Sequence, residues 1–127
     1  MKIHHAALYV HDLEGAKTFF ETYFKGKAGE QYHNVKTGFR SYFLTFEEGS
    51  RLELMYEPDL DGRSGTKKQY GYAHLAFSAK SKAAVDALTQ RLAEDGYQVI
   101  SGPRTTGDGY YESCVCGFEG NLVEITV

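Results

Sequence analysis

Apolar and polar residues alternate with a period of two in several short stretches of the chain, and in two longer stretches apolar residues recur at offsets of three and four. Alternation predicts half-buried β-strands, whereas offsets of three and four predict amphipathic helices. A helix is expected between Asp12, a good N-cap, and Gly26. Strands are expected in the first half at residues 2–10, 39–46 and 51–57, with a weaker pattern at 30–35.

The second half repeats this order. Ser81 takes the place of Asp12 as a helix cap, and Gly96 takes the place of Gly26 at the helix end. Strands are expected around residues 72–78, 97–100, 110–117 and 122–127, with a break at Gly102 and Pro103. Because strand, helix and three strands occur twice, the sequence predicts an α+β fold made of two tandem βαβββ modules.

The repeat includes polar residues at matching places. The motif His-x-Ala-apolar opens both halves, at His5 and at His74, which are 69 positions apart. Each half ends in an apolar run with a single acid, and these acids, Glu53 and Glu124, are 71 positions apart. Each module thus carries one histidine on its first strand and one glutamate on its last.

The length of the chain favours a single domain of residues 1–127, because either half alone would bury only a marginal core. Module one is expected at about residues 1–57 and module two at about 71–127, joined by a polar linker at 58–70. The two halves must therefore pack on each other or on a second chain.

Charge and composition exclude several kinds of partner. A net charge of −3 gives no electrostatic reason to expect nucleic acid or an anionic membrane. The chain has no signal-peptide pattern and no apolar run near the roughly 20 residues that span a bilayer, so a cytoplasmic location is expected. Cys114 and Cys116 agree with a reducing compartment; buried thiols are the simpler interpretation, and a strained disulfide or a soft-metal site is the alternative.

Four residues lie opposite the apolar rows that are expected to face the helices, namely His5, Glu53, His74 and Glu124. A carboxylate on an enclosed face is costly unless a positive group compensates it. Arg51 is the only lysine or arginine within two residues of any of the four. A divalent cation would balance the two carboxylates, and a mixed nitrogen and oxygen ligand set suits zinc, nickel, cobalt, manganese or iron(II).

A structural role is the simpler interpretation for any one of these residues. A single histidine on a strand is more often a hydrogen-bonded bystander than a ligand, and a single glutamate usually faces solvent. The repeat changes this balance, because the neighbouring residues differ between the modules whereas the histidine and the glutamate occur in both. The sequence therefore predicts that the four residues act together.

Residues 5–13, 51–54, 71–77 and 121–125 resemble the vicinal oxygen chelate superfamily, which has the glyoxalase I and bleomycin-resistance fold. The resemblance covers essentially the whole chain. It implies paired βαβββ modules whose strands curl into a mixed sheet around a metal, commonly in a homodimer. It also implies a small-molecule substrate.

By this resemblance His5, Glu53, His74 and Glu124 would bind a divalent metal ion, with zinc or nickel first and cobalt, manganese or iron(II) as alternatives. Glu124 would also carry the catalytic proton. The implied activity is that of a metal-dependent lyase or isomerase of the glyoxalase I type, acting on a small oxygenated or carbonyl substrate through a metal-stabilised enediolate. The alternative is a non-catalytic protein of the same fold that sequesters an antibiotic or a metabolite. Iron(II) dioxygenases use two histidines and one glutamate, so the additional Glu53 counts against that third class.

Two positions depart from glyoxalase I. Glutathione is usually held there by a basic residue near the end of the first helix and by an asparagine after the first glutamate ligand, but Thr22 and Glu57 stand at the matching positions. An anionic thiol conjugate is therefore not expected as the substrate. His4, His11 and His33 have no counterpart in the repeat and are expected to be structural or to face solvent.

Overall fold

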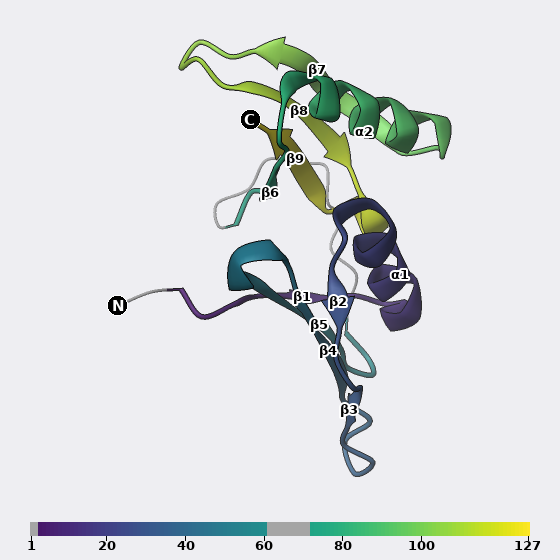
Figure 1. The fold of residues 1–127 in the computed structure, drawn as a ribbon. Coiled ribbons are helices and arrows are strands. Elements are labelled where there is room, and N and C mark those ends of the chain that lie inside the picture. The colour runs from purple at the N-terminus through teal and green to yellow at the C-terminus, as the bar shows by residue number, and fades with distance from the viewer. Residues whose placement is uncertain (1–2, 61–71) are drawn as a thin grey trace. The chain divides into compact units, whose positions relative to one another are not determined.

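The computed structural model describes residues 3–60 and 72–127. It divides into two compact units, Met1–Arg63 and Ser64–Val127, and each unit contains one helix and one sheet (Figure 1). We call them module one and module two. Most of the expected linker at 58–70 lies outside the described residues, and the expectation of a single domain with these module bounds stays a prediction.

Module one starts with β1 (Ala6–Tyr9) and α1 (Leu13–Phe24). The Asp12 side chain accepts a hydrogen bond from the Gly15 N–H at 2.9 Å, so the predicted cap and helix are confirmed. The remaining strands are β2 (Lys27–Ala28), β3 (Tyr32–His33), β4 (Arg40–Thr45) and β5 (Arg51–Tyr56). The two short strands both pair with β4, and β1 pairs parallel to β5, which gives the sheet order β1-β5-β4-β2.

Module two consists of β6 (Leu75–Ser78), α2 (Lys82–Glu94), β7 (Gln98–Thr105), β8 (Tyr111–Cys116) and β9 (Leu122–Thr126). It has the single strand β7 where module one has the two short strands β2 and β3. Its first strand is again parallel to its last, and the sheet order is β6-β9-β8-β7. The Ser81 side chain accepts from the Ala84 N–H at 3.2 Å and caps α2 as predicted. The α+β fold of two βαβββ modules with mixed sheets is therefore confirmed.

The expected break at Gly102 and Pro103 is wrong. β7 continues to Thr105 and pairs with β8 through two register shifts. Gly102 has a φ of +76°, and a Cβ atom there would lie 2.4 Å from the carbonyl oxygen of Glu112. Glycine at this position lets the strand bulge against its neighbour, so it keeps the strand paired rather than ending it.

Each helix packs on one face of its own sheet. In module one the buried strand residues are Leu44, Leu52 and Leu54, and in module two they are Val115, Val123 and Ile125. Because side chains alternate along a strand, the residue between two buried ones points to the opposite face. The packing of α1 and α2 therefore fixes the direction in which Glu53 and Glu124 point.

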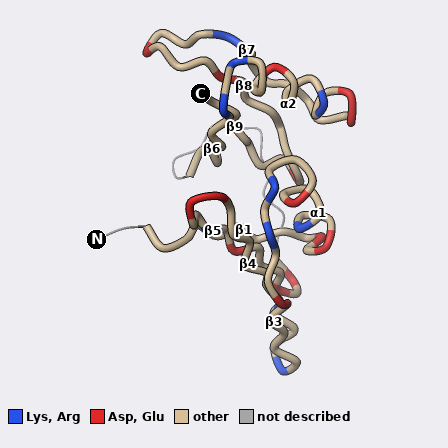
Figure 2. Tube along the Cα trace, viewed as in Figure 1, with Lys and Arg blue, Asp and Glu red and all other residues tan. Residues whose placement is uncertain are grey.

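Neither helix in the described part of the chain has the length and apolar character that crossing a membrane requires. Basic and acidic segments are interspersed along both modules (Figure 2).

A buried pair of hydroxyl groups joins α2 to β8 and provides a test of the packing of module two. Thr89 Oγ1 donates to the Val85 carbonyl at 2.7 Å and lies 2.6 Å from Ser113 Oγ, so it accepts from Ser113. Thr89→Val should cost about 1–3 kcal/mol of unfolding free energy, because it leaves the Ser113 hydroxyl buried without an acceptor. Ser113→Ala should cost about 1 kcal/mol or less, because Thr89 keeps its own acceptor. Urea unfolding of both variants measures the difference, and equal losses would contradict the assigned direction of donation.

Candidate metal centre

Parallel pairing of β1 with β5 brings His5 beside Glu53. Ala7 is the register partner of Glu53, and His5 lies two residues earlier on the same side of the chain. His5 Nε2 is 3.6 Å from Glu53 Oε2, and the two side chains keep 34% and 16% of their exposure. The pair is half-buried but reachable by a ligand.

Phe43 borders this pair. It is the cross-strand partner of Glu53 in the β4–β5 hairpin, and its ring packs edge-on against the His5 imidazole with centroids 5.1 Å apart. The aromatic ring covers one side of the His5–Glu53 pair and limits the directions from which a ligand can approach.

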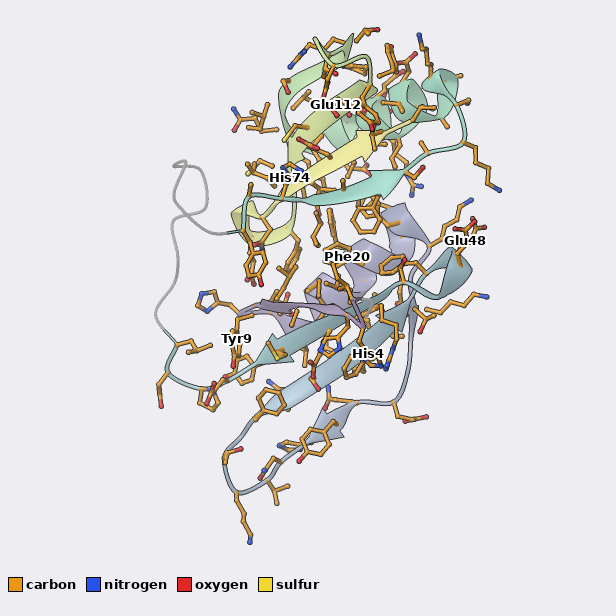
Figure 3. All side chains as sticks on the ribbon, turned by 90° about the vertical axis from the view of Figure 1, so that its left-hand side faces the viewer. His4, Tyr9, Phe20, Glu48, His74 and Glu112 are labelled. Carbon is orange, nitrogen blue, oxygen red and sulfur yellow. The ribbon has the colours of Figure 1, made fainter. Side chains whose placement is uncertain are left out.

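Parallel pairing of β6 with β9 produces the equivalent pair in module two. Ala76 is the register partner of Glu124, and His74 immediately precedes β6 (Figure 3). His74 Nε2 is 3.0 Å from Glu124 Oε2, with 39% and 20% of the side chains exposed. Cys114 is the cross-strand partner of Glu124, so a small thiol stands where module one has an aromatic ring.

The separations of the donor atoms fit neighbouring ligands of one ion. Two ligand atoms bound at about 2.0–2.2 Å in adjacent positions lie about 3.0–3.5 Å from each other. The distance of 3.0 Å in module two falls within this spacing, and the distance of 3.6 Å in module one lies just above it. Neither glutamate forms an ion pair with a lysine or arginine of the described residues.

We call each pair a half-site, because it would supply two of the four predicted ligands. In residues 3–60 and 72–127 there is no group of three or more His, Cys, Asp or Glu side chains arranged to hold a metal. A close contact between imidazole and carboxylate accounts for either half-site without a metal. That all four residues bind one ion stays a prediction.

A chain of polar contacts extends the module-one half-site. His5 Nδ1 is 2.8 Å from His4 Nδ1, and His4 Nε2 is 3.4 Å from Arg51 Nη1. Figure 3 shows His4 on the face of the module-one sheet opposite α1. Arginine can only donate, so a neutral His4 accepts at Nε2 and donates from Nδ1. His5 then accepts from His4 at Nδ1, and its Nε2 faces Glu53.

The surroundings of Glu124 are neutral. Burial raises the pKa of the Cys114 thiol, and the negative charge of the facing Glu124 raises it further. The thiol therefore stays protonated near neutral pH and acts as a small uncharged side chain. Thr126, on the same side of β9 as Glu124, has a buried hydroxyl with no hydrogen-bond partner among the described residues. A bound ligand could satisfy this hydroxyl.

Two residues beside the His5–Glu53 pair, His4 and Phe43, were not predicted from the sequence. His4 is not an isolated histidine, because it contacts both His5 and Arg51. Phe43 could have been found by counting through the predicted hairpin, since pairing Thr45 with Arg51 across the turn places Phe43 opposite Glu53. No sequence pattern signals the contact of His4, because it depends on where the chain runs before β1.

Two βαβββ modules, each with a histidine immediately before the first strand beside a glutamate of the last, define a protein of the glyoxalase fold. Residues 2–125 match the Glyoxalase/Bleomycin resistance protein/Dioxygenase superfamily, and the chain belongs to this superfamily. The uncharacterized protein YqjT of Bacillus subtilis (strain 168) is 31% identical to the chain over 116 residues, covering 86% of this chain and 85% of YqjT.

Solved structures share the fold at low sequence identity. A glyoxalase family protein from Bacillus cereus superposes with a TM-score of 0.85 at 18% identity, covering 99% of this chain and 93% of that one. The trypanothione-dependent glyoxalase I of Leishmania major gives a TM-score of 0.78 at 17% identity, with 98% and 85% covered. The fosfomycin resistance protein FosX of Listeria monocytogenes, complexed with Mn(II) and sulfate, gives 0.73 at 18% identity, with 99% and 91% covered.

The half-sites predict which substitutions weaken metal binding. Glu53→Gln and Glu124→Gln should each lower zinc affinity more than about ten-fold, because changes even to groups behind the ligands cost ten- to hundred-fold. Titration of metal-free protein with zinc in a calorimeter measures this loss. Glu112→Gln is the matched control, because Glu112 lies on the same side of β8 as Cys114 but outside both pairs. Equal zinc affinity in all three variants and the unmodified protein would contradict the assignment.

Proposed function

We propose that the protein is a metal-dependent lyase or isomerase of the glyoxalase I type that acts on a small oxygenated or carbonyl substrate. The observation that carries the proposal is the duplicated half-site, with imidazole and carboxylate atoms 3.6 Å apart in module one and 3.0 Å apart in module two. A structural ion pair in one module needs no counterpart in the other, whereas four ligands for one cation require both.

A divalent cation held by His5, Glu53, His74 and Glu124 would polarise two adjacent substrate oxygens and stabilise the negative charge that proton removal creates between them. The remaining chemistry belongs to the chain. Glu124 is the proton carrier, since its carboxylate is partly exposed and has no lysine or arginine partner in the described residues. His74 holds this carboxylate in position from 3.0 Å. The uncharged Cys114 adds no competing base beside it.

Residues at the glutathione positions argue against an anionic thiol conjugate. Thr22 and Glu57 are both exposed, and neither can pair with a peptide carboxylate. Glu57 would repel it. The substrate is therefore a compact molecule that enters the half-sites directly, without a long anionic handle.

We further propose that the protein is a homodimer. β1 and β6 are edge strands, each paired on one side only within the described sheets. Unpaired edge strands are available for pairing and are usually covered. Light scattering at micromolar concentration should give the mass of two chains, and a monomer would contradict the proposal.

The metal is the first test of the enzyme. Elemental analysis of purified protein should find a divalent metal, and added nickel or zinc should raise the melting temperature of metal-free protein. His74→Ala should abolish that rise, because it removes one of the four ligands and RT ln(1 + [L]/Kd) falls with affinity. Protein that contains no divalent metal, with a melting temperature that nickel and zinc leave unchanged, would overturn the catalytic proposal.

The reaction is tested with 2-oxoaldehydes, thiol conjugates and acyl-CoA substrates, followed by proton exchange at the carbon next to the carbonyl. Glu124→Gln should lower kcat by about 100-fold or more, in the range of general-base catalysis. Tight binding of a small molecule without turnover would favour a ligand-sequestering protein of the same fold. Oxygen consumption with a catechol would favour a dioxygenase.

A further inference from the structure

The two half-sites differ in the residues that surround them. By the offset that relates Glu53 to Glu124, Arg51 corresponds to Leu122 and Phe43 corresponds to Cys114. Module one therefore presents a cation and an aromatic ring beside its pair, whereas module two presents an apolar side chain and an uncharged thiol. Arg51 thus has no cationic counterpart at the matching position of module two.

Arg51 lies on the same side of β5 as Glu53. The two residues are separated by Leu52, which is buried against α1, so both side chains project from the opposite face. Phe43 contacts both Arg51 and the His5–Glu53 pair. Its ring packs against the His5 imidazole, and the Arg51 guanidinium lies 4.2 Å from the centroid of the ring. Arg51 thus stands directly beside the half-site rather than elsewhere on the sheet.

The guanidinium is held but not neutralised. Its cross-strand partner is Thr45, which carries no charge, and no carboxylate of the described residues forms an ion pair with Arg51. One nitrogen reaches a neutral acceptor, His4 Nε2, at 3.4 Å. Stacking on Phe43 fixes the plane of the guanidinium and leaves other N–H groups of its fork free to donate.

The charge balance of the proposed metal site also favours a cationic residue that binds the substrate. Two carboxylates and a divalent cation sum to zero, so an anionic group on the substrate would add a negative charge that the ligand set does not compensate. A planar guanidinium offers two parallel donors that match the oxygens of a carboxylate or a phosphonate.

We infer that Arg51 binds an oxyanion group of the substrate, and that the substrate class is a small carboxylate or phosphonate with an oxygen on the adjacent carbon. This inference deepens the proposed function and rests on it for the reaction. The recognition of the oxyanion by Arg51 does not itself require the metal.

The experiment compares anionic and neutral probes of similar size on protein as purified, with its metal content measured. Pyruvate supplies a carboxylate, methylphosphonate supplies a phosphonate, and hydroxyacetone is the neutral probe. Affinities come from NMR titration, and the Nε–Hε signal of Arg51 is assigned by its loss in Arg51→Met. Arg40→Met is the matched control, because Arg40 stacks on Tyr56 at 4.5 Å in the same sheet but belongs to the row that faces α1.

Arg51→Met should weaken binding of at least one anionic probe by about ten-fold or more, as expected for loss of a charge-assisted hydrogen bond. Hydroxyacetone affinity should change less than about two-fold, Arg40→Met should behave as the unmodified protein, and the Arg51 Nε–Hε signal should shift on anion binding. The probe that loses more affinity identifies a carboxylate or a phosphonate as the recognised group.

Unchanged anion affinity in Arg51→Met overturns the inference. An equal loss of affinity for anionic and neutral probes also overturns it, because Arg51 would then contribute to the shape of the site and not to recognition of the oxyanion. If Arg51→Met does not fold, Arg51→Lys provides the comparison, because it keeps the charge and loses the planar fork; unchanged binding of both anions by that variant overturns the two-donor geometry. The metal tests remain separate. Protein without metal, whose melting temperature nickel and zinc leave unchanged but which still binds an anion through Arg51, overturns the proposed enzyme and keeps the oxyanion site.

Discussion

Parallel pairing of the first strand of each module with its last strand is the contact on which the site depends. In module one a helix and three further strands lie between these two strands, so His5 and Glu53 are far apart in sequence but adjacent in space. The same pairing joins His74 to Glu124. Because the ladder fixes the relative height of the two strands, it brings the histidine that immediately precedes the first strand beside the glutamate of the last strand.

The core on the other face keeps this register in place. Leu52 and Leu54 are almost completely buried against α1, and Val123 and Ile125 are buried against α2. A slip of one residue in either last strand would expose these apolar side chains and bury the glutamate between them. The energetic cost of that exchange is several times the value of any contact within the half-sites. The alternation of apolar and polar residues along the last strand of each module therefore determines both the stability of the core and the geometry of the candidate site.

Most of the fold could be predicted from the sequence because its signals are local. The caps at Asp12 and Ser81, the helical periods and the alternating strands each depend only on neighbouring residues. The repeat in the sequence indicated that the chain contains two such modules. The strand through Gly102 was missed because its bulge is set by the approach of Glu112, which lies on another strand. The side-chain neighbours of the half-sites, Phe43 and His4, were missed for the same reason, since they depend on cross-strand register and on the path of the chain before β1.

The difference between the two half-sites bears on stereochemistry. Each module repeats the same imidazole and carboxylate side chains. If both pairs bound one substrate with two adjacent oxygens, as the proposed function requires, that substrate would have two equivalent ways to bind to them. The residues Phe43 and Arg51 beside the first pair, and Cys114 and Leu122 beside the second, would remove that equivalence. The substrate would then offer one prochiral face to Glu124. Divergence of the residues around a repeated pair would thus be a route from a symmetric, undiscriminating site to one that distinguishes mirror-image products.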